Sequence, residues 1–511
     1  MLKADIAWCD LSHVPQWRQD VIVVGNSRIT PYRHAALETI LVRTEGRWFA
    51  QVRERRAGID SNGAATVETV TDERFEDLYR SCLLWPLDYV MLEVAQRGCR
   101  IKLRAGVLGS APVYCHATDE RLTVSWDFAD FLPQKLPIDF EVASCSLALR
   151  EAYSARQICV GVNLLTERAA LYLEPGKAQY RYPTAFAVST SAQPQSDTDA
   201  VAGFGELLQK ALSTRPMTTD RIAVELSGGM DSAAVACALS ARHGQVMSQG
   251  ILLSGNFRSS QVERRRKIVA RLGLRDETVD IDTLPPSLDV WPGMRKEYVH
   301  TEYYLEAFEA LWSSAHTQGC DLMFTGLGGD ELFMAFAEPA QQSVVGDREI
   351  EGSQHYAEKL LTPHALRAAR SVHAFDAPPG PVPSVAASVS KAHHLLRHGL
   401  WPVNPLSDPN LGSFCYRLAP EHRHARETMR RYVHACLGEE IFPCNYVKET
   451  FAQVFPALIA RQKDAIAVQM QECALADLGL VNQRAVLALL EEVTATQAID
   501  AISPLVNVLP D

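Results

Sequence analysis

The amino-acid sequence predicts an α/β protein, with an amino-terminal β-sandwich (α+β) domain followed by a doubly wound parallel-sheet domain that has a carboxyl-terminal helical part. The first indication is length, because 511 residues exceed what one hydrophobic core usually serves. The second is a series of short apolar or alternating runs over the first 185 residues, which is typical of strands. The third is the alternation of strand-like and helix-like runs after residue 200.

In the amino-terminal part, strands are predicted at residues 20–24, 48–52, 89–92 and 122–126. Turn residues separate these runs, and we assign residues 1–185 to the sandwich. Residues 186–199 are rich in small and polar side chains, which indicates a linker. Residues 200–511 form the second predicted domain.

The second domain begins with strands and helices in alternation. Strands are predicted at residues 221–226, 245–253, 277–281 and 321–324. Helices are predicted at residues 200–213, 231–243, 261–272 and 298–316. This order indicates a parallel sheet with helices on both faces, whose ligands bind beyond the carboxyl ends of the strands.

A glycine loop joins the first strand of this sheet to its helix. It is built from Leu226, Ser227, Gly228, Gly229, Met230, Asp231 and Ser232. Glycines let the backbone approach an anion, the helix amides face it, and serine hydroxyls add donors, so we predict a phosphate site. Asp231 would repel a bare phosphate, and it therefore implies a divalent cation, most simply Mg²⁺. The lysine of a Walker loop is missing, and a plain Gly-Gly turn is the alternative.

A second glycine loop with an acid follows the strand at residues 321–324. It carries Gly326, Gly328 and Asp330. If its strand lies near the first one, Asp330 can approach the same cation as Asp231 and give it a second carboxylate. The alternative is a plain glycine turn capped by an aspartate.

The rest of the chain is less informative. Residues 376–390 are rich in proline and small residues and are expected to form an exposed excursion. Residues 423–437, 448–461 and 483–493 have the apolar spacing of helices. Lys448 would stand at a helix start, an unfavourable end for a cation, so the residues alone favour a solvated lysine over one that serves a nearby negative charge.

Composition excludes several functions. The net charge of −11 and a pI near 5.8 argue against a general nucleic-acid or anionic-membrane binder. No apolar run has the length of a membrane span and the start lacks a signal-peptide core, so we expect a cytoplasmic protein. The 12 cysteines include no CxxC pair, which favours free thiols over disulfides or a structural metal.

With both loops, the chain resembles the asparagine synthetase-like amide ligases, which pair a glutaminase-like domain with an ATP pyrophosphatase domain. Residues 227–232 resemble the pyrophosphate loop of that family, and residues 325–331 its second metal-binding loop. Weaker similarities lie at residues 104–115, 171–176, 403–408 and 446–451. The resemblance implies ATP and Mg²⁺ as cofactors, metal ligands Asp231 and Asp330, and an inward-facing, catalytic Lys448.

Residues that differ from the family's motifs narrow the range of possible functions. Leu2 stands where glutamine-using members have a cysteine nucleophile, and nothing marks Cys9 as a substitute, so we expect no glutaminase activity. Leu327 stands where asparagine synthetases have glutamate and β-lactam synthetases tyrosine, and Trp401 aligns with a further glutamate. In lacking this dyad and in its inactive glutaminase domain, the chain resembles the lasso-peptide cyclase branch.

The predicted reaction is ATP-dependent amide (macrolactam) bond formation through a carboxyl-adenylate, with release of AMP and pyrophosphate. The substrate would be a peptide or natural-product intermediate that supplies its own amine, with a partner such as a leader-peptide protease and no nucleic acid or membrane. The alternatives are an ammonia-dependent asparagine synthetase and a catalytically silent nucleotide-binding scaffold. Leu327 argues against the first, and the two acids with Lys448 argue against the second.

Overall fold

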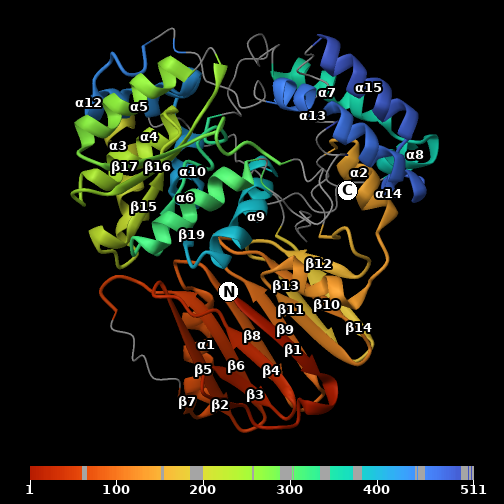
Figure 1. The fold of residues 1–511 in the computed structure, drawn as a ribbon. Coiled ribbons are helices and arrows are strands. Elements are labelled where there is room, and N and C mark those ends of the chain that lie inside the picture. The colour runs from red at the N-terminus through yellow and green to blue at the C-terminus, as the bar shows by residue number, and fades with distance from the viewer. Residues whose placement is uncertain are drawn as a thin grey trace.

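The computed structural model describes residues 1–59, 66–150, 155–183, 199–255, 258–287, 302, 304–333, 346–371, 382–443, 446, 455–496, 505 and 508. Figure 1 shows antiparallel sheets at the bottom, a parallel sheet with its helices at the upper left, and a further group of helices at the upper right. The predicted mixed α/β class is confirmed. The predicted domain limits stay predictions, because most of the predicted linker lies outside the described residues.

Two sheets make up the amino-terminal part, and within the described residues each has seven strands. One has the order β12 (Val162–Leu165), β10 (Val113–Ala117), β11 (Arg121–Ser125), β1 (Leu2–Ala7), β4 (Ser27–Pro31), β3 (Val21–Val24) and β2 (Gln16–Arg18). The other has the order β14 (Lys177–Arg181), β13 (Ala170–Glu174), β9 (Arg100–Ala105), β8 (Tyr89–Ala95), β6 (Arg47–Glu54), β5 (Leu37–Thr44) and β7 (Val67–Thr69). The four strands predicted for this part of the chain overlap β3, β6, β8 and β11, and two of the predicted ranges extend one residue too far.

The sandwich core lies between these sheets, because alternate side chains of each strand point inward. Ile6 and Val24 of one sheet share a buried cluster with Val52 and Leu92 of the other. The outer face of the second sheet is covered by helix α1 (Asp72–Leu83), whose Phe75 packs among the buried outer-face residues.

The parallel sheet has the strand order β17 (Arg275–Asp280), β16 (Met247–Leu252), β15 (Ile222–Glu225), β18 (Leu322–Phe324) and β19 (Trp401–Val403). All neighbours pair in parallel. From β15 the chain adds β16 and then β17 on one side. It then returns and adds β18 on the other side of β15. This reversal creates the crevice where ligands bind in doubly wound sheets.

Helices cover both faces of this sheet. Ile222 and Val224 face a cluster that includes α3 (Ala200–Ser213), α4 (Met230–Ser240), α5 (Arg258–Leu272) and α12 (Glu427–Leu437). The intervening Ala223 faces the opposite cluster, with α6 (Leu305–Thr317) and α9 (Val382–Arg397). Strands buried on both faces explain why β18 and the first three residues of β15 are continuously apolar rather than alternating.

The remaining helices form the group at the upper right of Figure 1. It contains α7 (Gly346–Leu360), α8 (Pro363–Ser371), α13 (Phe455–Gln469), α14 (Ala474–Asp477) and α15 (Gln483–Thr496). Helix α2 (Phe140–Leu147) comes from the amino-terminal part of the chain, yet Leu147 shares the buried core of this group with Ala365 of α8. Short helices α10 (Pro409–Arg417) and α11 (Pro420–Arg423) lead from β19 to α12.

Several sequence predictions need correction. The exposed excursion predicted at residues 376–390 is wrong from residue 382 onward, where α9 begins. A proline at position 383 falls in the first turn, where a helix needs no backbone N–H donor, so it does not prevent the helix. The helix predicted at residues 423–437 is divided, because Ala425 and Arg426 adopt left-handed backbone angles before α12 begins.

Two ion pairs join the sandwich to the parallel-sheet part. Arg215, just after α3, binds the carboxylate of Glu54 at the end of β6, and both side chains are almost fully buried. Arg397 at the end of α9 binds Asp127 with distances of 2.7 and 2.9 Å. These contacts fix the base of the parallel sheet on one end of the sandwich. Among the described residues, no helix has both the length and the apolarity that a bilayer crossing demands.

Candidate active site

The first glycine loop leaves β15 and enters α4 in a compact turn. Gly228 has φ +91°, a backbone conformation that favours glycine. The Ser227 hydroxyl accepts from the Gly229 N–H at 3.2 Å, and the Ser232 hydroxyl donates to the Gly229 carbonyl at 3.0 Å. The two hydroxyls lie 3.2 Å apart. Serines therefore brace the loop, while the amino end of α4 gives it the positive dipole that suits a phosphate.

Residues that the sequence analysis missed support this loop from α5. Gln261 Nε2 donates to the Ser227 carbonyl at 2.9 Å, and Arg264 Nε donates to the Gly228 carbonyl at 2.6 Å. Arg265 lies beneath, where its Cγ would be 3.2 Å from a Cβ on Gly228, and it pairs with Asp276. Burial lowers the pKa of Arg265, although Asp276 works against this shift. The loop thus rests on two guanidinium groups, which add positive charge below the predicted anion site.

The second glycine loop is held by the chain that follows β19. Thr325 Oγ1 donates to Asn404 Oδ1 at 2.7 Å and accepts from the Leu327 N–H at 3.1 Å. Gly328 has φ +94°, and a Cβ there would lie 2.5 Å from Ser407 Oγ. The sequence segment 403–408, which resembles the family only weakly, is therefore the wall against which this loop is packed.

The two loops meet because their strands are neighbours. Val224 of β15 pairs with Phe324 of β18, so the residues beyond them leave the sheet side by side. A Cβ on Gly326 would lie 2.9 Å from the Ser232 nitrogen, and one on Gly329 would lie 2.5 Å from Asp231 Cγ. Such distances are too short for any residue larger than glycine, and they bring Asp231 close to Asp330.

Asp231 and Asp330 converge on one nitrogen atom. Arg426 Nη1 lies 2.8 Å from Asp231 Oδ1, 3.1 Å from Asp231 Oδ2 and 2.9 Å from Asp330 Oδ1. Burial disfavours the charge of Arg426, but the two carboxylates outweigh it and raise the pKa of Arg426. Sequence analysis missed this residue, because its partner Asp231 is 195 positions away and no local pattern signals the contact.

This donor set fits a divalent cation of the Mg²⁺ type. Two carboxylates aimed at one point supply hard oxygen ligands, and such ions usually complete their coordination with water and substrate phosphates. Within the described part of the chain, no cluster of three or more His, Cys, Asp or Glu residues could hold a metal by itself. A cation here would therefore depend on a bound phosphate for its remaining ligands.

The other predicted residues are placed as follows. Leu226 is fully buried, and its N–H donates to the Gln249 carbonyl at 2.7 Å, which ties the loop to β16. Leu327 lies in the second loop, and Trp401 is buried in β19. Leu2 is buried in the sandwich core, whereas Cys9 is exposed. Lys448 lies outside the described residues, but Tyr446 is described and lies 4.8 Å from the guanidinium of Arg264.

A buried charged pair lies on the opposite face of β15, two residues before Ser227. Glu225 accepts from Lys391 Nζ of α9 at 2.6 Å and from the Trp312 indole of α6 at 3.1 Å. Lys391 also lies 4.0 Å from the centre of the Phe308 ring. Because both charges are paired and hydrogen-bonded, this contact holds α6 and α9 against the sheet directly behind the first loop.

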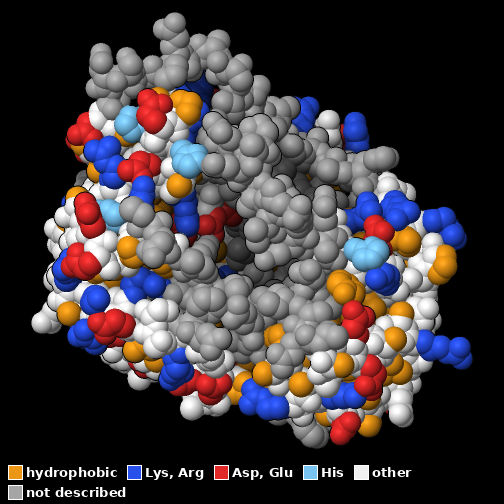
Figure 2. Space-filling view, turned by 90° about the horizontal axis from the view of Figure 1, so that it is seen from above, with side chains coloured by type: hydrophobic (Ala, Val, Ile, Leu, Met, Phe, Trp, Pro, Cys, Tyr) orange, Lys and Arg blue, Asp and Glu red, His pale blue; other side chains and the backbone are white. Residues whose placement is uncertain are grey.

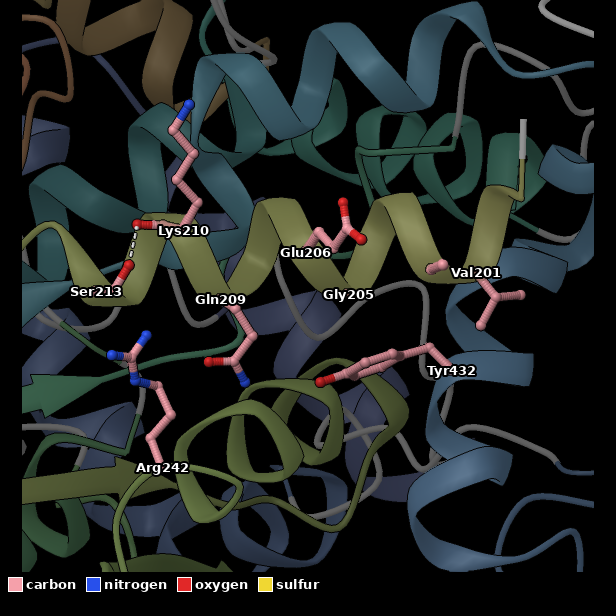
Figure 3. Close-up of a pocket in the computed structure, with 9 residues that line it drawn as sticks. Val201, Gly205, Glu206, Gln209, Lys210, Ser213, Arg242 and Tyr432 are labelled. Carbon is pink, nitrogen blue, oxygen red and sulfur yellow. Dashed lines mark hydrogen bonds between the residues drawn. The ribbon is translucent and has the colours of Figure 1, made fainter. Parts of the chain in front are cut away.

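One face of the molecule is hollowed. Figure 2, which shows the molecule from above, has a hollow near the middle with acidic and basic side chains along the described part of its wall. A separate open groove of about 610 Å³ lies between α3 and α12. Figure 3 shows Gln209 and Tyr432 pointing toward each other across it. This groove contains none of the predicted site residues, and its lining lacks the converging acids of the loops.

Fold and loops together define an α/β protein that has two glycine loops at the ligand-binding edge of its parallel sheet. The family model described as Asparagine synthase matches residues 203–395, a range that contains both glycine loops. This match supports an asparagine synthetase-like family, whose members are ATP-dependent ligases. The match ends before Arg426 and Lys448, so it assigns no role to either residue.

Comparisons of the whole chain with curated proteins and solved structures add little evidence about function. No curated protein matches the sequence. One of the solved structures that match is the U34-tRNA thiolase NcsA from Methanococcus maripaludis, with 11% sequence identity over 58% of this chain and 79% of that chain. The TM-score is 0.25, so this likeness carries no argument about the present chain.

Proposed function

We propose that the protein forms an amide bond, in particular a macrolactam, by activating a substrate carboxylate as an acyl-adenylate at the expense of ATP. The observation that carries the proposal is the convergence of Asp231 and Asp330 beside a glycine loop, at the reversal point of a doubly wound sheet. Loops at this place hold anionic ligands in such sheets, and two acids require a cation between themselves and a phosphate.

In the proposed reaction, a carboxylate oxygen of the substrate attacks the α-phosphorus of ATP. The bond to the bridging oxygen breaks, and pyrophosphate leaves with that oxygen. An amine of the substrate then attacks the acyl carbon, loses a proton, and displaces AMP. The net result is one amide, one AMP and one pyrophosphate for each ATP. Mg²⁺, when bound, would neutralise charge on the departing pyrophosphate.

The residues of the chain have distinct tasks in this scheme. The loop formed by Ser227, Gly228 and Gly229, with the Ser232 hydroxyl, would hold the pyrophosphate. Asp231 and Asp330 would hold the cation. Lys448 would face the charge that develops at the α-phosphate and acyl carbon, and the contact between Tyr446 and Arg264 supports this, because Arg264 itself supports the Gly228 carbonyl.

Macrolactam formation is favoured over asparagine synthesis by the second loop. Leu327 has no titratable group, whereas asparagine synthetases have a glutamate at the position that it occupies. An ammonia-dependent asparagine synthetase is the second candidate, favoured by the match to the Asparagine synthase family over residues 203–395. A peptide substrate would also fit a partner protein that prepares it, such as a leader-peptide protease.

The test is to incubate the purified protein with ATP, Mg²⁺ and the linear peptides encoded beside its gene, and to record masses. We expect a product lighter by one water and equimolar AMP. Parallel reactions with aspartate and ammonia test the second candidate. Exchange of labelled pyrophosphate into ATP reports adenylation even when the amine step fails. Absence of exchange with every carboxylate, in protein that binds ATP, would overturn the proposal in favour of a silent scaffold.

A further inference from the structure

Arg426 occupies the position between Asp231 and Asp330 that a bound cation would need. Its Nη1 atom contacts both carboxylates at 2.8 and 2.9 Å. Mg²⁺ binds carboxylate oxygens at roughly 2.0–2.1 Å and is demanding about its octahedral geometry. The nitrogen atom and a metal ion cannot occupy the same point between the two carboxylates, so binding of the guanidinium and binding of the metal there exclude each other.

The backbone directs Arg426 into this position. Ala425 has φ 48° and ψ 29°, and Arg426 has φ 57° and ψ 35°, so two successive residues with Cβ atoms adopt the sparsely populated left-handed region. The segment is held on both sides. Thr428 Oγ1 donates to the His422 carbonyl at 2.7 Å, and Met429 and Val433 of α12 are fully buried.

The charges explain what the contact achieves. Without a cation, two carboxylates at this distance repel each other, and the guanidinium removes most of that repulsion. With a divalent ion in its place, Arg426 would be released beside the phosphates that complete the metal's coordination. Its side chain is about 21% exposed, so one side of it faces solvent.

We propose that Arg426 is a positioning residue that holds Asp231 and Asp330 together as a resident cation and is displaced when the metal enters with its nucleotide. Two consequences follow. The metal alone binds weakly, because it must first displace a charge-assisted hydrogen bond to each acid. The nucleotide strengthens metal binding, because its phosphates receive the released guanidinium. The second consequence rests on the proposed function, whereas the first does not.

The metal-only arm of the test uses Mn²⁺, whose free ion is counted by electron paramagnetic resonance, with the full-length protein and no nucleotide. We expect Arg426→Gln to bind Mn²⁺ at least about ten-fold more tightly than the wild type, since a charged competitor is gone. Arg431→Gln is the matched control, because Arg431 is exposed on α12, the helix that follows Arg426, and its loss changes the net charge equally. Equal Mn²⁺ affinity in wild type, Arg426→Gln and Arg431→Gln overturns the proposal.

The nucleotide arm adds an ATP analogue with a methylene group between its α- and β-phosphorus atoms, which cannot release pyrophosphate. We expect the analogue to tighten Mn²⁺ binding more in the wild type than in Arg426→Gln. If no variant binds the analogue, the proposed function fails, while the metal-only result still decides the role of Arg426. If circular dichroism shows that Arg426→Gln is unfolded, Arg426→Met, which keeps the apolar stem, takes its place with the same expected result.

Discussion

Gly329 and Asp231 lie so close that a Cβ atom on Gly329 would be 2.5 Å from Asp231 Cγ. Each residue belongs to a different glycine loop, so the missing side chain of one sets the position of the carboxylate of the other. Glycine here serves close approach rather than an unusual backbone angle. A single methyl group at position 329 should therefore disturb the predicted cation site.

Gly329→Ala should reduce pyrophosphate–ATP exchange by about 10²-fold, because a shift of about 1 Å in a reacting geometry costs that much. The fold should survive, since the clash is with a side chain at the loop surface. Gly412→Ala is the control, because nothing lies within 4 Å of a Cβ at that position. Exchange at the wild-type rate in Gly329→Ala would mean that Asp231 need not stay where it is.

Asp231→Asn and Asp330→Asn should each nearly abolish pyrophosphate release, because each removes a negative charge that the cation requires. Circular dichroism and thermal unfolding should show folded proteins, since Arg426 retains one carboxylate partner in either variant. A steady-state assay over a range of Mg²⁺ concentrations is the measurement. Turnover close to wild type in either variant, at any Mg²⁺ concentration, would remove that acid from the site.

Lys448→Ala should lower turnover on the order of 10²-fold or more and change ATP affinity less, by analogy with loss of one oxyanion donor. Lys448→Arg should rescue poorly, because a planar guanidinium does not replace a compact ammonium. Single-turnover rates and ATP binding are measured separately. A normal rate for Lys448→Ala would show that Lys448 is a solvated lysine and that another cation faces the charge at the α-phosphate.

Asp88 gives a prediction about pH and stability in the sandwich. Burial, and then the charge of Glu54, raise the pKa of Asp88 from 3.8 to about 6, although its carboxylate accepts from the Ser110 N–H at 2.6 Å. The folded state therefore holds this proton more tightly than the unfolded state. The free energy of unfolding should fall as the pH rises from about 4 to 6, by at most about 3 kcal/mol.

Asp88→Asn cannot lose that proton, so its stability relative to the wild type should increase between pH 4 and pH 7. Urea unfolding at both pH values measures the difference. Asp119→Asn, on an exposed turn, serves as the control for removal of a carboxylate. If the free energies of unfolding of Asp88→Asn and wild type differ by the same amount at both pH values, Asp88 does not titrate in this window.

Cys436 of α12 should be the reactive thiol of the helix pair. A hydrogen bond from the Cys237 thiol of α4 lowers the pKa of Cys436 to about 7, and Cys436 is exposed while Cys237 is buried. Because the thiolate is the nucleophile, alkylation by iodoacetamide should reach half its maximal rate near pH 7. Peptide mapping by mass spectrometry assigns the site. In Cys237→Ala the half-point should move up toward 9, and an unmoved half-point would exclude the hydrogen bond as the cause.

Local patterns in the sequence were sufficient for the central strand and both glycine loops. β15 is a short apolar run, and a glycine pair followed by a helix of small residues marks the turn after it. β19 was missed because three residues, one of them Pro402, carry no periodicity, and the strand exists only by pairing with β18. The helix α9 was missed because proline-rich composition outweighed the buried positions that follow, such as Leu395.

The residues of the candidate site that the sequence does not predict are brought there by long-range contacts. Arg426 meets Asp231 across 195 positions, and Arg264 reaches the Gly228 carbonyl across 36. Neither arginine has a sequence context that separates it from a solvated one, because only the packing of α12 and α5 beside α4 brings them to the loops. Two converging acids could be proposed from the sequence, but not the guanidinium of Arg426 that lies between them.

Through the ion pairs Arg215–Glu54 and Arg397–Asp127, each half of the molecule supplies the partners for charged side chains of the other half. A parallel-sheet half without the sandwich would present two guanidinium groups, and the apolar residues around them, to water at its base. Arg397 ends the helix that carries Lys391, and Lys391 holds Glu225 directly before the first glycine loop. Through these contacts the sandwich would support the first glycine loop without contributing a residue to it.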